Sequence, residues 1–162
     1  MSSGKYQLTC AKQSDANDIF VLEEASFPPD EAASFETICD RMSEAGKFFY
    51  TYRSENGELV GFINGTCIVG PKILHESMTN HEPLGRILVI HSVTIKESMR
   101  RLKLGTRMLR EYITRMKDEL SIDQILLLSK ANMLTFYVDC GFHLGCLSDV
   151  CHGQDKWFEM RM

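Results

Sequence analysis

The chain has 162 residues, of which 44% are apolar and 25% are charged, and its formal net charge is -4. A chain of this length and composition is expected to form a single globular domain over residues 1–162. No apolar run approaches the roughly 18 residues of a membrane span, and the slightly acidic balance argues against nucleic acid as a partner.

The N-terminal part of the chain predicts a strand followed by a helix. Apolar and polar residues alternate over residues 6–10, as they do in a half-buried strand. A helix capped by Ser14 or Asp15 is expected next. It should end at Phe27, because the next two residues are prolines that stop a helix.

A second helix and a hairpin are expected after these prolines. The helix should close at Gly46, since glycine is common just after a helix C-terminus. Asn56 and Gly57, between two apolar runs, predict a two-residue hairpin turn. The expected ranges are a helix over 35–42, strands over 47–52 and 59–68, and a long loop over 70–86.

The stretch from His91 to Tyr112 is the most informative one, because it joins a buried strand to an amphipathic helix through a basic loop. Successive side chains of a strand point to opposite faces. Strict alternation puts one set of side chains on a single face: Ile87, Val89, His91, Val93 and Ile95. In the helix, apolar residues recur every three or four positions and form the expected buried face: Leu104, Met108, Leu109, Tyr112, Ile113, Met116 and Leu120.

The loop before this helix is a candidate anion site. The first N–H groups of a helix lack internal partners and carry the positive end of its dipole, so a diphosphate can bind there. The basic residues around it are Lys96, Arg100, Arg101, Lys103 and Arg107. The alternative is an ordinary solvated helix start. Neither a P-loop motif nor GxGxxG is present, so kinase-like and Rossmann interpretations lose support.

The rest of the chain predicts a buried strand over 124–129, a short helix over 132–139, and an antiparallel pair over 142–146 and 156–162. The expected fold class is mixed α/β (α+β), with a mixed, mostly antiparallel sheet and helices on both faces. The six cysteines form no CxxC pair and no secretory signal is recognisable. We therefore expect reduced thiols, no metal site and a cytoplasmic location.

Three motifs stand out in the chain: ESMTNHEPLG at Glu76 to Gly85, HSVTI at His91 to Ile95, and FYVDCGF at Phe136 to Phe142. Together with the order of elements, they resemble the GNAT superfamily of N-acetyltransferases, and within it the arylalkylamine N-acetyltransferases. The resemblance covers nearly the whole chain. It implies the GNAT fold, whose central strands splay apart, and acetyl-CoA as the cosubstrate without a metal.

In that family the cofactor loop reads Gln or Arg, two residues, Gly, one residue, then Gly or Ala. Here Arg100 holds the first position and Gly105 the last, but Lys103 stands where the first glycine is expected. Lysine is strained at a positive φ and unstrained in a right-handed helical conformation. We expect the second, because the loop leads directly into a helix. The resemblance implies a set of cofactor-binding residues: Val93, Thr94, Ile95, Arg100, Arg101, Leu102, Lys103, Leu104, Gly105, Thr106 and Phe136.

Amine acetylation needs a proton acceptor, because an alkylamine with a pKa near 10 is only about one part in a thousand free base at pH 7. His91 matches the family's catalytic histidine, which assists proton loss through water. The alternative is a half-buried core histidine. Vertebrate members carry a second histidine two residues earlier, where this chain has Val89. Glu24 and Asp30 are therefore candidate carboxylates for the proton path.

Tyr137, in FYVDCGF, matches the family's general acid, which protonates the CoA thiolate as it leaves. The alternative is a packed aromatic side chain. A covalent acetyl-cysteine at Cys140 is a third option, but the sequence shows no base that would activate it. The resemblance further implies an amine pocket that includes Phe27, Pro28 and Trp157, with core packing as the alternative for the two aromatic residues.

The resulting hypothesis is transfer of the acetyl group of acetyl-CoA to the primary amine of an arylalkylamine, by direct attack in a ternary complex. The acidic segment FPPDEAAS keeps a polyamine or another cationic amine as an alternative substrate. A non-catalytic acyl-CoA-binding module and a protein N-terminal or lysine acetyltransferase are two further hypotheses. We expect a monomer or weak dimer with a small-molecule partner and no nucleic-acid or membrane partner.

Overall fold

The computed structural model describes residues 5–120 and 122–162. Within these residues, seven strands form one sheet in the order β1-β2-β3-β4-β5-β7-β6. β4 and β5 pair in parallel and the other neighbours pair antiparallel. The strands are β1 Tyr6–Cys10, β2 Phe49–Ser54, β3 Leu59–Ile68, β4 Ile87–Ile95, β5 Gln124–Ser129, β6 His143–Leu147 and β7 Phe158–Arg161.

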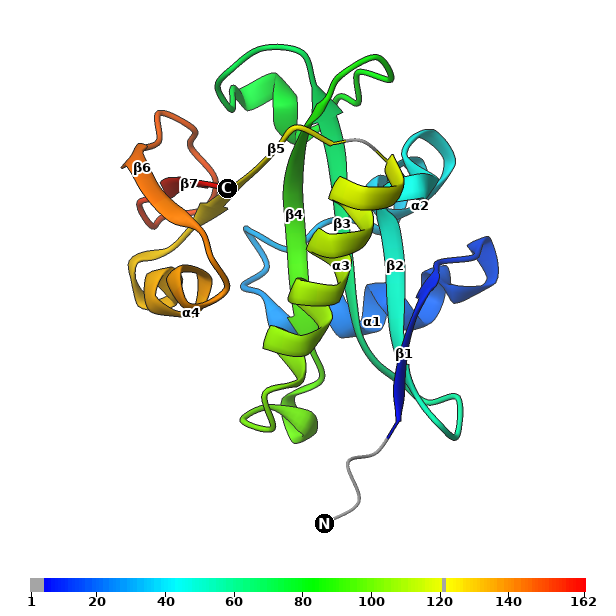
Figure 1. Cartoon of the computed structure of the whole chain (residues 1–162). Coiled ribbons are helices and arrows are strands. Elements are labelled where there is room, and N and C mark those ends of the chain that lie inside the picture. The colour runs from blue at the N-terminus through cyan, green and yellow to red at the C-terminus, as the bar shows by residue number, and fades with distance from the viewer. Residues whose placement is uncertain (1–4, 121) are drawn as a thin grey trace.

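The helices lie on both faces of this sheet, so the predicted fold class is confirmed. Figure 1 shows α3 across the front of the sheet, α1 and α2 behind it, and α4 beside β6 and β7. The helices are α1 Ala16–Ser26, α2 Phe35–Glu44, α3 Leu104–Leu120 and α4 Leu134–Asp139. None of the helices in the described part of the chain is long and apolar enough to cross a membrane.

Packing of one apolar face holds α3 on the sheet, as the sequence predicts. Met108, Leu109, Tyr112 and Met116 are fully buried, and the Tyr112 hydroxyl donates to the carbonyl oxygen of Phe48 at 2.7 Å. Burying a large apolar side chain contributes about 1.5–3 kcal/mol. The N-terminus of α3 is therefore held in a fixed position relative to β4.

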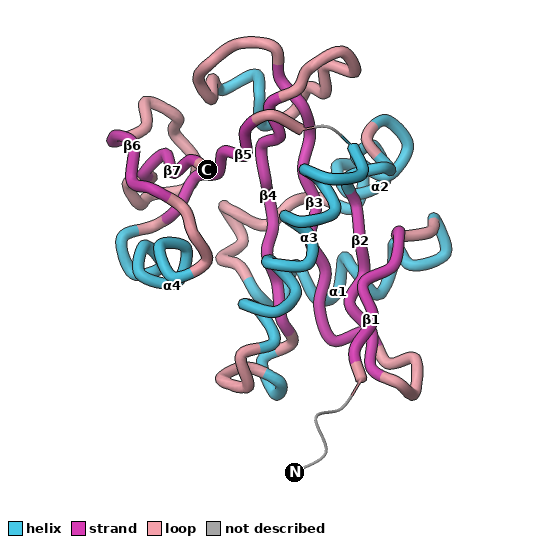
Figure 2. Tube along the Cα trace, in the orientation of Figure 1, coloured by secondary structure: helices cyan, strands magenta, loops and turns pink. Residues whose placement is uncertain are grey.

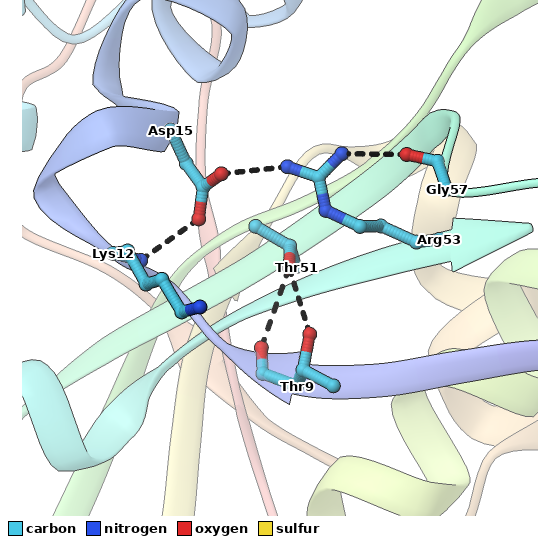
Figure 3. Close-up of polar contacts among 6 residues, drawn as sticks. All are labelled: Thr9, Lys12, Asp15, Thr51, Arg53 and Gly57. Carbon is cyan, nitrogen blue, oxygen red and sulfur yellow. Dashed lines mark hydrogen bonds and ion pairs between the residues drawn. The ribbon is translucent and has the colours of Figure 1, made fainter.

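A small polar cluster fastens the start of α1 to the hairpin between β2 and β3 (Figure 3). Asp15 stands at the N-cap position, but its carboxylate accepts from the Lys12 N–H at 2.8 Å and from Arg53 at 2.6 Å. Arg53 also donates to the carbonyl of Gly57 at 2.9 Å. The expected cap is thus replaced by an ion pair that connects two elements far apart in the sequence.

Two sequence predictions about chain turns are wrong in detail. Gly46 does not close α2: the C-cap is Ala45, and Gly46 begins a short 3-10 turn, so β2 starts later than predicted. The hairpin loop contains three residues, 55–57, because the N–H of Ser54 bonds the carbonyl of Glu58. Gly57, at a φ of +83°, still takes the left-handed conformation that favours glycine.

A bulge in β4 changes the predicted faces of the central strand. Ser92 pairs with Asn64 of β3, whereas Ile90 pairs with Gly65, so His91 is an extra residue in the ladder. Before the bulge, Ile90 faces the α3 core, and after it Val93 packs against the same core. Strict alternation is therefore broken at His91.

The same region is where the sheet splits. β4 and β5 pair only through residues 87–90 and 124–127. Beyond Ile90, β4 is paired on its β3 side alone, and Figure 1 shows β5 running away from β4 toward β7. The expected splay of the central strands is confirmed, and it opens the edge of β4 over Ser92 to Ile95.

Candidate active site

His91 faces the α1 and α2 side of the sheet, on the same face as Thr66 and Val89. Its Nε2 lies 2.7 Å from the Thr66 hydroxyl on β3, and its Nδ1 is buried without a partner among the described residues. Burial, followed by the positive charge of Arg41, holds the pKa of His91 well below its ordinary 6.5. His91 is therefore a neutral imidazole near pH 7.

A carboxylate that the sequence analysis missed lies against Ser92, the next residue of β4. Glu23 of α1 is 3% exposed, accepts from the N–H of Ala33 at 3.0 Å, and lies 3.4 Å from the hydroxyl of Ser92, the neighbour of His91. Burial raises the pKa of Glu23 above its ordinary value of 4.5. Such a group is a better proton acceptor than an exposed carboxylate, because its pKa is closer to neutrality.

The two carboxylates proposed from sequence, Glu24 and Asp30, are exposed. Glu24 is on the solvent side of α1, whereas the buried positions of this helix are Ala16, Ile19 and Glu23. Those three positions are spaced by three and four, which is a helical stripe. A carboxylate on an otherwise apolar stripe was the signal that could have identified Glu23.

Arg41 of α2 supplies the positive charge of this group. Its guanidinium donates to the carbonyl of Met78 in the β3–β4 loop at 3.3 Å, and burial lowers its pKa to about 10. The cation disfavours protonation of His91 and favours ionisation of Glu23. The group therefore consists of a neutral imidazole, His91, an ionisable carboxylate, Glu23, and a permanent cation, Arg41, whose charge acts on both.

The loop before α3 differs from the expectation for Lys103. Lys103 has a φ of +60° and Arg101 a φ of +63°, so both take the left-handed conformation, and the predicted right-handed helical conformation is wrong. Both residues lie in the four-residue connection between the short 3-10 turn at Glu97–Met99 and the start of α3 at Leu104. The family pattern has glycine at position 103, which suits a positive φ, and this chain adopts the same left-handed conformation with lysine.

The basic residues of this loop are not equivalent. Arg100 donates to the carbonyl of Ile95 at 2.9 Å, and Lys96 pairs with Glu58 at 2.8 Å. Arg101 and Lys103 are exposed and pair with no acidic group in the described ranges. Two unneutralised cations at the N-terminus of a 17-residue helix are suited to an anion.

Lys103→Gly is expected to raise the free energy of unfolding by about 0.5–1 kcal/mol. Relief of left-handed strain is worth about 1–2 kcal/mol, and part of it is offset by the greater freedom of glycine in the unfolded chain. Urea denaturation measures this change. Lys117→Gly, on the exposed side of α3, is the matched control and should lower the free energy by about 1 kcal/mol. A loss of stability in both variants would contradict strain at Lys103.

Tyr137 lies next to the same loop. Phe136 of α4 lies 3.5 Å from the position of a Cβ on Gly105, and the Tyr137 ring packs edge-on against Phe136 and Phe142. The Tyr137 hydroxyl makes no hydrogen bond to other described residues. Burial, followed by the neighbouring Cys140 thiol, raises the pKa of Tyr137, so the phenol keeps its proton throughout the neutral range.

Cys140 itself is an unsuitable nucleophile. The side chain is buried, and burial raises the pKa of its thiol. A thiol that stays protonated near pH 7 attacks a thioester slowly. The acetyl-cysteine alternative therefore loses support. The part of the chain that the structure describes contains no group of three or more His, Cys, Asp or Glu side chains that could hold a metal ion.

An open depression of about 440 Å³ lies where the α1–α2 loop meets the β6–β7 loop. It is lined by Pro28, Pro29, Asp30, Glu31, Gln154 and Asp155. The α1–α2 loop is the pink segment left of β4 in Figure 2, on the side where β5 diverges. His152, from the β6–β7 loop, acts electrostatically on both His91 and Glu23. The depression therefore lies on the side of the sheet that carries these two groups.

The three residues predicted to bind the amine have different positions. Pro28 lines the depression. Trp157 is half-buried, its indole N–H donates to the carbonyl of His152 at 2.6 Å, and Lys130 lies over its ring. Phe27 is half-buried in the residue just after α1.

Two ligands can thus approach the split in the sheet from opposite faces, an anionic one at the α3 N-terminus and a second one at the depression. This layout is that of an acyltransferase whose acyl donor carries phosphates. The chain matches the family model of the acetyltransferase (GNAT) family over residues 16–142, and it belongs to that family. It is therefore an acetyl-CoA-dependent N-acetyltransferase.

Similar proteins support this assignment. The chain is 26% identical over 145 residues to a serotonin N-acetyltransferase of Mesocricetus auratus, covering 84% of this chain and 67% of that protein. A serotonin N-acetyltransferase of Macaca mulatta is 27% identical, covering 85% and 68%. Among solved structures, the GphF GNAT-like decarboxylase in complex with isobutyryl-CoA superposes with a TM-score of 0.85 at 16% identity, covering 96% of this chain and 97% of that chain. This last likeness concerns the fold.

Proposed function

We propose that the protein acetylates the primary amine of an arylalkylamine, by direct attack of the amine on acetyl-CoA in a ternary complex. The observation that carries the proposal is the similarity to serotonin N-acetyltransferases along most of the chain. The buried Glu23, which bonds the α1–α2 loop that lines the depression, and His91 support it, because they could supply the proton acceptor that an amine needs.

The anionic donor would be held by the loop and helix start described above. Arg101 and Lys103 would neutralise its pyrophosphate together with the first N–H groups of α3. The open edge of β4, over Val93 to Ile95, would bond its pantetheine arm. Leu102, Leu104, Thr106 and Phe136 would border the same path. Acetyl-CoA supplies the activated acetyl group.

On the amine side, Glu23 would take up the proton of the ammonium, directly or through a water molecule relayed by His91. The amine nitrogen then attacks the carbonyl carbon, a C–N bond forms, and the C–S bond breaks. The second proton lost by the nitrogen passes through water to the departing thiolate, which leaves as the CoA thiol. Tyr137 would donate a hydrogen bond to the sulfur as negative charge develops on it. A thiol with a pKa of about 8.5 is a stronger acid than this phenol. The phenol therefore stabilises the thiolate mainly by hydrogen bonding.

A polyamine is the second candidate substrate, and the lining of the depression favours it. Three of its six lining residues are acidic: Asp30, Glu31 and Asp155. Lys130 neutralises part of this charge. A second ammonium group of the substrate would be attracted there, whereas an aromatic ring would gain only the contact with Pro28 and Pro29.

A substrate panel separates these two candidates. Thiol release from acetyl-CoA is followed with tryptamine, serotonin, phenylethylamine, putrescine and spermidine at equal concentration. We expect the highest kcat/KM for one of the arylalkylamines, and a preference for spermidine would assign the polyamine function instead. If no small amine is turned over while calorimetry shows acetyl-CoA binding, a non-catalytic module or a peptide substrate would replace the proposal.

A further inference from the structure

The loop between α1 and α2 is tied to the C-terminal part of the chain by five residues, which we call the latch: Glu31, Lys130, His152, Asp155 and Trp157. Lys130 is the residue after β5. Its Nζ lies 2.6 Å from the Glu31 carboxylate and 3.0 Å from Asp155 Oδ2. The same ammonium lies over the Trp157 ring, 5.4 Å from the centroid. One side chain thus connects β5, the α1–α2 loop and the β6–β7 loop.

The central ion pair of the latch is shielded from water. The side chain of Glu31 is 4% exposed and that of Lys130 is 24% exposed, whereas the Lys72–Asp149 pair is 48% and 85% exposed. Exposed pairs contribute little, because water and salt screen them. A buried carboxylate that loses its partner is left as an uncompensated charge. The position of the loop therefore depends on Lys130 far more than on a surface lysine.

Backbone contacts hold the loop at the same point. His152 Nε2 donates to the carbonyl of Glu31 at 2.9 Å, and Trp157 donates to the carbonyl of His152. Gly153 has a φ of +69°, and a Cβ there would lie 2.7 Å from Glu31 Cγ. Glycine therefore permits both the backbone conformation and the close approach of the two loops.

The loop that the latch holds also bonds the candidate proton acceptor. Ala33 is two residues after Glu31, and its N–H donates to Glu23 at 3.0 Å. Glu31 and Asp155 line the depression from its two sides. Release of the loop at Glu31 would therefore disturb both the wall of the depression and the orientation of the Glu23 carboxylate.

We propose that Lys130 is a positioning residue that holds the α1–α2 loop closed against the β6–β7 loop, and that it thereby sets the affinity for the acceptor amine. This inference rests on the proposed function, because it takes the depression as the amine site. The proposed acetyl-CoA site lies at the N-terminus of α3, on the other face of the sheet, and none of the five latch residues belongs to it, so we expect its affinity to change little when the latch is broken.

Lys130→Met tests the proposal, because methionine keeps the apolar stem and removes the charge. If only about a tenth of the molecules keep the loop closed, the KM for the amine rises about tenfold. The KM for acetyl-CoA stays within about twofold of wild type, because that site is not coupled to the loop. Glu31→Gln breaks the same pair from the other side and should act alike. Lys130→Arg should restore near-normal behaviour, and Lys72→Met is the surface control.

Trp157 reports the state of the latch without any turnover, because it is the single tryptophan of the chain. Acrylamide should quench its fluorescence more strongly in Lys130→Met and Glu31→Gln than in wild type or Lys72→Met. Quenching identical to wild type in both latch variants would overturn the proposal, and so would equal rises in both KM values. A lack of turnover with every amine would refute the proposed substrate while the quenching result still decides the latch.

Discussion

Tyr137→Phe is expected to lower kcat about 100-fold and to leave the affinity for acetyl-CoA within about twofold of wild type. Loss of one hydrogen-bond donor to a developing negative charge costs about 2.7–4 kcal/mol, which corresponds to 100-fold or more. The ring still packs against Phe136 and Phe142 in the variant, so the fold of α4 is retained. Steady-state kinetics and calorimetry with acetyl-CoA measure the two quantities separately.

The pH dependence provides an independent check on Tyr137. Burial raises the pKa of this phenol above its ordinary value of 10, so no loss of activity from its ionisation is expected below pH 10. Phe142→Leu is the matched control: it removes an aromatic neighbour of Tyr137 but no hydroxyl, and it should reduce stability more than kcat. A Tyr137→Phe variant with a normal kcat would show that water protonates or stabilises the leaving thiolate.

Local patterns predict the elements of this fold well. The helical stripe of α3 and the strand at 124–129 are confirmed, because both rest on burial that the apolar residues encode directly. The antiparallel pair at the C-terminus is confirmed as well, although the residues of β6 are exposed. The sequence predictions are wrong where tertiary contacts determine the backbone conformation. Gly46 lacks a positive φ because the chain enters a 3-10 turn that buries Phe48, and nothing in the local sequence specifies that turn.

The candidate site is predicted less completely, for two physical reasons. Alternation cannot reveal a bulge, so the sequence places Val93 on the same face as His91, whereas the extra residue in the ladder moves Val93 to the opposite face, into the α3 core. The conformation of Lys103 depends on the path of the chain between β4 and α3. The right-handed conformation expected for a lysine just before a helix is therefore not the one that it adopts.

Contacts between residues far apart in the sequence are also not revealed by local patterns. Lys130 and Glu31 are 99 residues apart, and neither belongs to a motif. Glu23 could have been inferred from its place in the buried stripe of α1, but its bonds to Ala33 and Ser92 are visible only in three dimensions. Motif reasoning proposes reacting groups on the strand and on α4, and the structure adds Glu23 as a candidate carboxylate for the proposed proton path.

Glu23→Gln is expected to lower kcat/KM for the amine at least 100-fold at pH 7 without lowering stability. A positioned general base contributes about 10²–10⁴-fold, and glutamine cannot accept the proton. Glutamine keeps the contacts, since its oxygen accepts from Ala33 and its amide donates to the Ser92 hydroxyl. The deficit should shrink as the pH approaches 10, because the solvent then supplies free amine. A pH profile of kcat/KM from pH 6 to 10 measures both effects.

The stability of the same variant separates a base from a structural residue. Because burial raises the pKa of Glu23, its ionisation above the ordinary value of 4.5 costs folding free energy, and this cost grows as the pH rises through the raised pKa. Glu23→Gln removes the cost, so urea denaturation at pH 7 should show equal or greater stability, whereas at pH 4 the two proteins should differ less. Glu24→Gln, next to it on the exposed side of α1, should change neither stability nor rate. A Glu23→Gln variant that is inactive and unstable at every pH would make Glu23 a structural residue and leave His91 as the proton acceptor.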